Sequence, residues 1–178
     1  MAIAAGDFEL TLDELRVVAR YAVESAQEVL TIFEAAHPED TRPRTAVEAA
    51  WTFANGAPRT KLQRVASLDA HRAAKAADSE AARHAARAAG DAAAAAYLHP
   101  LAKATQVGHI LRATASAARA AELRAGDDPA VGDALIQQAR QRATPVLIDV
   151  LGRYPLAPTG RNRAAHLMKT LDSSLRTP

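Results

Sequence analysis

Apolar residues recur along most of this chain at the three- and four-residue spacing that is typical of an α-helix. The first such stretch begins at Thr11-Leu12-Asp13-Glu14, which has the residue types of a capping box, and ends before Pro38. Its apolar positions lie on one helical face: Leu12, Leu15, Ala19, Ala22, Ala26, Val29 and Phe33. The pattern predicts a helix of roughly seven turns with one buried side.

Capping residues, proline and glycine predict where the next helices begin and end. Asp40-Thr41-Arg42-Pro43 indicates the start of a second helix, and Asn55-Gly56 indicates its end. Pro58 is expected to open a third helix that continues to Ala77. Residues 78–80 either cap a fourth helix or form a polar stripe on one continuous rod. The apolar positions are Val47, Ala50, Trp51 and Ala54 in the second helix, and Leu62, Val65, Ala66 and Leu68 in the third.

The stretch from Val65 to Glu122 consists of two alanine-rich segments, separated by Tyr97-Leu98-His99-Pro100. Alanine has the highest intrinsic helix propensity, and its small side chain lets two helices approach each other closely. We therefore expect helices over residues 65–98 and 100–124 that pack against each other at the centre of the molecule.

The last third of the chain also has a helical pattern. Asp127-Asp128-Pro129 predicts the start of a helix, which Pro145 should kink or split after Arg142. A final helix follows the proline-containing segment 154–158, with Ala164, Leu167, Met168, Leu171 and Leu175 facing inward. No segment alternates as a strand would. The sequence predicts an all-α fold in one domain over residues 1–178. We expect an irregular bundle or short stack of roughly six to eight antiparallel helices around the central alanine-rich helix pair.

Composition limits both the chemistry and the location. The chain contains no cysteine, which excludes disulfides, thiolate zinc sites and a cysteine nucleophile. Its first residues lack the basic and apolar regions of a signal peptide, and no stretch is apolar enough to span a membrane. We therefore expect a cytoplasmic protein that does not associate with membranes.

Charge is distributed unevenly along the chain. Residues 1–40 carry nine acidic and two basic side chains, whereas residues 41–124 carry thirteen basic and six acidic ones. The asymmetry fits either a nucleic-acid surface or an acidic first helix that lies beside a basic middle. Because the basic residues are spread over several predicted helices without interleaved aromatic residues, nucleic acid is the least favoured partner.

Motifs that would indicate a known catalytic mechanism are absent. The sequence has no phosphate-binding glycine loop, dinucleotide fingerprint, nucleophile elbow or zinc-binding HExxH helix, so we expect no catalytic residue and no cofactor. Glu80 and His84 are one helical turn apart but have no third ligand at suitable spacing, so no metal site is predicted. Tyr97, His99 and His109 flank the helix break, where they either line one small-ligand pocket or lie inside the bundle as satisfied polar groups.

A second group of candidate residues lies at the start of the predicted second helix. This group either forms a partner-binding patch or has structural roles, and it consists of Arg42, Arg44, Glu48 and Trp51. In the structural interpretation Arg44 and Glu48 form a surface ion pair and Trp51 is buried in the core. The two arginines would then clamp the acidic first helix through Glu34, Glu39 or Asp40.

Several blocks of the sequence resemble a known family. DTRPRTAVEAA at residues 40–50, followed by an aromatic residue and Gly56, is similar to the motif of a bacterial immunity protein family, the fifth immunity class of polymorphic toxin systems. AARAAG at 85–90, YLHPL at 97–101 and QVGHIL at 106–111 resemble its later blocks, so that the resemblance covers residues 10–125. Relatives often have histidine after Gly90, where this chain has Asp91.

The resemblance implies an actinobacterial-type member of the family and an all-α protein without catalytic residues. Its implied role is to bind a cognate protein toxin and neutralise it inside the producing cell. The residues themselves leave a different class of function open. A helical protein with an apolar pocket and a few polar groups could instead bind a small molecule, for example to sequester an antibiotic.

Overall fold

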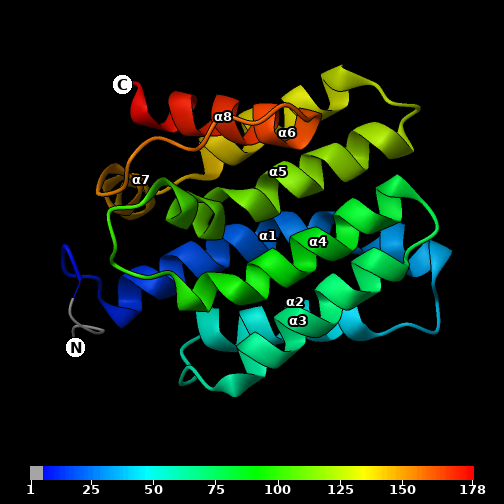
Figure 1. Ribbon diagram of the computed structural model, residues 1–178, viewed down its shortest axis with the longest axis horizontal. Helices are drawn as coiled ribbons and strands as arrows, with labels where there is room; N and C mark the ends of the chain where they lie inside the picture. The colour runs from blue at the N-terminus through cyan, green and yellow to red at the C-terminus, as the bar shows by residue number, and fades with distance from the viewer. Residues whose placement is uncertain (1–5) are drawn as a thin grey trace.

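Eight α-helices form most of residues 6–178, the part of the chain that the computed structural model describes (Figure 1). They are α1 (Leu12–Ala36), α2 (Arg42–Ala54), α3 (Lys61–Ala76), α4 (Glu80–Ala94), α5 (Val107–Arg124), α6 (Pro129–Arg142), α7 (Pro145–Gly152) and α8 (Arg163–Arg176). Two short 3-10 turns, η1 (Ala95–Tyr97) and η2 (Ala104–Gln106), lie between α4 and α5. Successive helices from α1 to α6 run antiparallel (Figure 1), and the described residues contain no strand. The prediction of an all-α, antiparallel arrangement is therefore confirmed.

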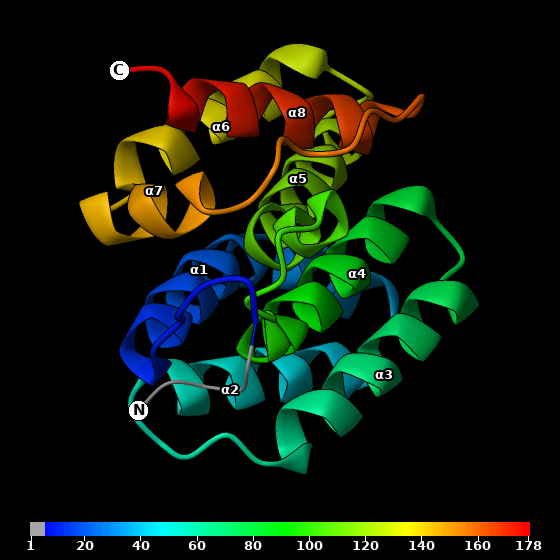
Figure 2. The ribbon, with the colours of Figure 1, turned by 60° about the vertical axis from the view of Figure 1, so that its left-hand side comes forward.

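The helices are stacked in layers (Figure 2). Helices α1 and α4 form the middle layer, and α2 and α3 cover one side of it. Helices α5 and α7 lie on the other side, and α6 and α8 pack outside α5. A continuous cluster of buried apolar residues includes side chains from all eight helices. No helix within residues 6–178 is both long and apolar enough to cross a bilayer.

Helix α1 begins at the predicted capping box. The Glu14 amide donates to Thr11 Oγ1 over 3.1 Å, and the Thr11 amide donates to Glu14 Oε2 over 2.8 Å. The predicted apolar face is buried except for Leu12, which is half-buried. Val18, Val23 and Leu30 are buried as well. Because α1 lies in the middle layer, with helices packed against several of its sides, it buries more than one face.

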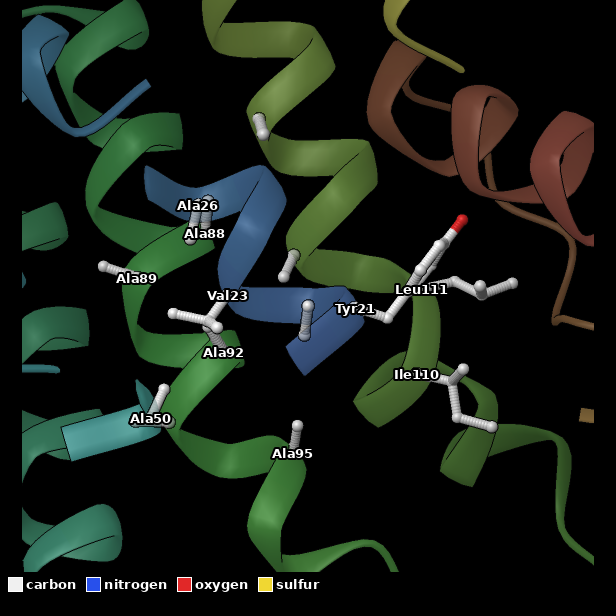
Figure 3. Close-up of a cluster of buried hydrophobic side chains, with 14 of the residues drawn as sticks. Tyr21, Val23, Ala26, Ala50, Ala88, Ala89, Ala92, Ala95, Ile110 and Leu111 are labelled. Atoms are coloured by element: carbon white, nitrogen blue, oxygen red, sulfur yellow. The ribbon is translucent and has the colours of Figure 1, made fainter. Parts of the chain in front are cut away.

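The alanine-rich centre consists of α4 and α5, as expected, with α1 as a third member. Figure 3 shows Ala88 and Ala92 of α4 on the side that faces Val23 and Ala26 of α1. All four of these side chains are fully buried. Small side chains at this contact allow the helices of the middle layer to pack closely.

The boundaries of this central pair differ from the prediction. Of the two alternatives for residues 78–80, the structure has the helix cap: Ser79 accepts a 3.2 Å hydrogen bond from the Ala82 amide, so that residues 65–98 are divided between α3 and α4. The second central helix begins at Val107 rather than at residue 100. The residues before α5 do not continue a helix from residue 100, and Pro100 and Ala102 form hydrogen bonds with Asp7 instead. The Asp7 amide donates to the Pro100 carbonyl over 2.8 Å, and the Ala102 amide donates to Asp7 Oδ2 over 2.7 Å.

Helix α3 turns its large apolar residues outward, contrary to the expected pattern. Leu62, Val65 and Leu68 are 44%, 48% and 52% exposed. The buried side of α3 carries small or polar residues instead: Gln63, Ala66, Ser67, Ala70, Ala73 and Ala74. Small residues suit this side because α3 packs on the alanine-rich α4. The buried Gln63 amide nitrogen is satisfied by the Ala49 carbonyl of α2, at 3.1 Å.

The third helix also begins later than predicted, at Lys61 instead of Pro58. Thr60 caps it in a capping box with Gln63. The predicted interruption at Pro145 is a complete break, because α6 ends at Arg142 and Thr144 caps α7. The Arg142 side chain then returns to α1, where its Nε donates to Glu24 Oε2 over 2.7 Å and its Nη2 donates to Ser25 Oγ over 2.7 Å.

Candidate functional site

The arginines at the start of α2 are engaged in bidentate ion pairs. Arg42 contacts Asp40 through Nε–Oδ1 at 2.9 Å and Nη2–Oδ2 at 2.6 Å. The hydrogen bonds from Arg42 hold the pKa of the Asp40 carboxyl below its usual value. Arg44 contacts Glu34 of α1 through Nε–Oε1 at 2.6 Å and Nη2–Oε2 at 2.9 Å. Asp40 and Glu34, two of the three acids that the clamp interpretation named, are thus the partners of these arginines.

The other two residues of the predicted patch are placed differently from expectation. The Arg44–Glu48 ion pair does not form among residues 6–178, because Arg44 is paired with Glu34 instead. Glu48 is exposed. Trp51 is half-buried rather than enclosed in the core, with its Nε1 donating to Gln27 Oε1 and the Arg20 guanidinium 5.2 Å from its ring centre.

Replacing Arg44 with alanine tests the clamp directly. If the Arg44–Glu34 pair fastens α2 to α1, the melting temperature of Arg44→Ala should fall at low salt, and the difference should shrink in high salt because this pair is exposed to solvent. Thermal melts at two salt concentrations measure this. An unchanged melting temperature with weaker partner binding would instead support the recognition interpretation.

Next to α2, the outward side of α3 combines apolar and cationic side chains. We define the α3 face as Arg59, Lys61, Leu62, Arg64, Val65 and Leu68. Its three apolar members are spaced three residues apart, which places them along one stripe of the helix. None of its three cations forms an ion pair with a carboxylate of residues 6–178. The surface is therefore apolar with a net positive charge.

Tyr97 of η1 connects the α3 face to a pocket behind it. The guanidinium groups of Arg59 and Arg64 lie 5.1 Å and 5.0 Å from the Tyr97 ring centre. The Tyr97 hydroxyl donates a 2.6 Å hydrogen bond to the Thr60 carbonyl. These contacts hold both arginines over an aromatic face, where cation–π attraction positions them without a carboxylate.

The predicted small-ligand residues line a common pocket of about 230 Å³, which we call the histidine pocket. Its walls are Arg64, Ser67, Leu68, Ala94, Tyr97, His99 and His109. Burial, followed by the charge of Arg112, lowers the pKa of His109. His109 is therefore a neutral imidazole at pH 7 and offers one donor and one acceptor.

Asp91, one turn of α4 from the pocket wall at Ala94, is a site residue that sequence reasoning did not identify. Its carboxyl is buried, with His71 Nε2 at 3.4 Å and Arg112 Nη1 at 3.8 Å, and its Oδ2 has no hydrogen-bond partner among residues 6–178. Gly90 makes room for this arrangement, because an added Cβ would lie 2.7 Å from His71 Nε2. A glycine and a carboxylate inside an alanine-rich run were the available sequence signal.

These groups suit hydrogen bonding to a small polar ligand better than metal binding. Within residues 6–178 no three histidine, cysteine or acidic side chains are close enough together to hold a metal ion. Glu80 Oε2 and His84 Nε2 lie 3.9 Å apart, and the two residues form an i,i+4 pair on α4. The α3 face and the histidine pocket share Arg64 and Leu68, so the two candidate sites are parts of one region.

Comparison with known proteins identifies a family. No curated protein and no solved structure matches this chain. A family model described as Imm-5 like putative immunity protein matches residues 9–145, which include helices α1 to α6. The match covers most of the chain, extends beyond the 10–125 region in which the motifs were noted, and contains both candidate sites. The chain therefore belongs to the Imm-5 like putative immunity protein family.

Proposed function

We propose that this protein is a non-catalytic immunity protein, which binds a cognate protein toxin and neutralises it in the cytoplasm of the producing cell. Family membership over residues 9–145 carries the proposal. We further propose that residues 1–178 act as one domain and that the source is an actinobacterium, as the sequence resemblance implies. Neutralisation by binding needs a complementary surface and no chemical step.

The α3 face supports this role because its large apolar side chains are exposed and its three cations have no carboxylate partner among residues 6–178. Leu62, Val65 and Leu68 are exposed to water, so their burial does not stabilise the protein alone. A partner with an apolar surface would bury these side chains and gain that stabilisation on binding. Arg59, Lys61 and Arg64 favour a partner whose apolar surface has an acidic rim. We propose that the toxin docks here and extends over the neighbouring α2 patch of Arg42, Arg44, Glu48 and Trp51. Arg42 and Arg44 would then leave Asp40 and Glu34 and pair with carboxylates of the toxin.

The test uses the toxin domain of a toxin gene that lies beside the gene of this protein, if the genomic neighbourhood contains one. Val65→Asp places a carboxylate in the middle of the α3 face, where it should weaken toxin binding by about thirtyfold or more and abolish protection of growth. Because Val65 is exposed, the melting temperature should stay close to that of the parent protein. Isothermal titration calorimetry and a co-expression growth assay provide the two measurements.

Val146→Asp is a matched control on the opposite layer. Val146 of α7 is 44% exposed, which is close to the 48% of Val65, so both substitutions add the same charge at similar exposure. Equal affinities for the two variants would contradict docking on the α3 face. Failure of the parent protein to bind the toxin or to protect growth would contradict the proposed function itself.

The histidine pocket favours a second candidate function, the binding of a small molecule for self-resistance. Tyr97, His99 and His109 line this one pocket, where they supply polar groups beside apolar walls. The genomic neighbourhood separates the two proposals. A toxin gene beside this one favours the immunity role, whereas a cluster of biosynthetic genes favours sequestration of their product.

A further inference from the structure

A separate pocket of about 270 Å³ lies between α4, α5 and the start of α8. We call it the cationic pocket. Among its lining residues are His84 and Arg87 of α4, Arg112 and Ser116 of α5, and Asn162 and Ala164 at the beginning of α8. These residues do not line the α3 face or the histidine pocket, although Arg112 also lies 3.8 Å from Asp91. The C-terminal wall of the pocket also lies outside the family match, which ends at residue 145.

The pocket holds more positive charge than its surroundings neutralise. Arg87 is exposed and forms no hydrogen bond or ion pair within residues 6–178. The Nη1 atom of Arg112 lies 3.8 Å from Asp91 Oδ1, which is too long for a hydrogen bond. Other arginines of this protein, such as Arg44, Arg153 and Arg163, have carboxylates at 2.6 Å. Arg87 and Arg112 therefore have guanidinium donors available for an anion.

His84 provides a further polar group that lacks a partner. Its side chain is only 12% exposed, and its Nδ1 is buried without a hydrogen-bond partner among residues 6–178. The nearest carboxylate, Glu80 Oε2, is 3.9 Å from the other ring nitrogen, and Glu80 is itself paired with Arg83. A buried polar atom without a partner is costly in a folded protein, and a bound ligand is one way to satisfy it.

The start of α8 adds to the positive character of one wall. Asn162 caps this fourteen-residue helix by accepting a 2.8 Å hydrogen bond from the Ala165 amide. The amides of the first helical turn and the helix dipole favour negative charge beside Ala164. This contribution supplements the two arginines, which supply the larger charge.

From this arrangement we infer that the cationic pocket binds a small anion that carries a phosphate group. Guanidinium forks bind phosphate oxygens in pairs, and the hydroxyl of Ser116, which lines the pocket from α5, can donate one hydrogen bond. The volume is below the roughly 300–1,000 Å³ of pockets for drug-sized ligands, which suits inorganic phosphate or a small phosphate ester. The inference goes beyond the proposed immunity function and does not depend on it.

Calorimetric titration of the full-length protein with inorganic phosphate tests the inference, with all solutions matched in ionic strength by chloride. We expect saturable binding of phosphate and a shift of the His84 ring resonances in NMR spectra over the same concentration range. Arg87→Gln should weaken phosphate binding by about tenfold or more, since a charge-assisted contact is lost. Because Arg87 is exposed and unpaired, this variant should fold as the parent protein does.

Lys75→Gln is the matched control, because it also removes one positive charge from an exposed helical position away from the pocket. It should leave phosphate affinity unchanged. If the two substitutions weaken phosphate binding equally, the effect comes from net charge alone, and the proposed site would be overturned. Acetate binding as tightly as phosphate would overturn the assignment to phosphate. Absence of any phosphate-dependent heat or His84 shift would overturn the inference altogether.

Discussion

Replacing Glu122 with alanine is expected to lower the free energy of unfolding by about 3 kcal/mol, the lower end of the range for a broken buried ion pair. Glu122 of α5 is completely buried. Its Oε2 accepts a 2.9 Å hydrogen bond from Arg119, and its Oε1 accepts bonds of 2.9 Å and 2.6 Å from Arg163 at the start of α8. The lower end applies because both arginines are partly exposed and have second carboxylate partners, in Asp127 and Asp133.

The packing around Glu122 leaves little room for compensation. Gly132 of α6 lies directly against it, so that an added Cβ would overlap the Glu122 carboxylate. Alanine at position 122 would leave a cavity beside this glycine and remove the ion pair between Glu122 of α5 and Arg163 of α8. Denaturant unfolding curves measure the loss of stability. Glu28→Ala is a suitable control, because Glu28 is an exposed glutamate of α1 that forms no ion pair with residues 6–178, and it should change stability by less than about 0.5 kcal/mol. Equal losses for the two variants would show that the buried carboxylate adds nothing specific.

Enlarging an alanine of α4 is expected to have the second-largest effect. Ala85→Leu and Ala89→Leu should each lower the free energy of unfolding by about 1–3 kcal/mol, since extra methyl groups have no space in a close-packed interior. Both alanines are fully buried in the middle layer, where α4 touches α1, α3 and α5. Thermal and denaturant melts of each variant provide the measurement.

Ala134→Leu on α6 separates overpacking from a general effect of leucine. Ala134 is exposed within a helix, and alanine and leucine have similar helix propensities, so this variant should unfold close to the parent protein. Melts of Ala89→Leu that coincide with those of Ala134→Leu would mean that α4 has space on its buried side. That outcome would contradict the close packing of the middle layer.

Features that depend on neighbouring residues could be predicted from the sequence. The capping box at Thr11, the ends of α1 and α2, and the break at Pro145 all follow from backbone chemistry within one or two turns of helix. The alanine-rich segments predicted the central helix pair for a similar local reason, because helix propensity and small side-chain volume belong to the residue itself. For Tyr97, His99 and His109 the sequence left open a shared pocket or separate positions inside the bundle, and in the structure all three line one pocket beside the helix break.

Features that depend on residues distant in the sequence were not predictable. The outward turn of Leu62, Val65 and Leu68 follows from the alanine-rich face of α4, which α3 approaches with its own small residues. The sequence offered Arg44 several acidic partners, Glu48 on its own helix and others before it, and the position of α1 against α2 selects Glu34. Glu122 is buried because α5, α6 and α8 converge there, so that Arg163 and Gly132 surround it. Local propensity specifies the helices, but the choice of buried face and ion-pair partner depends on which helices pack together.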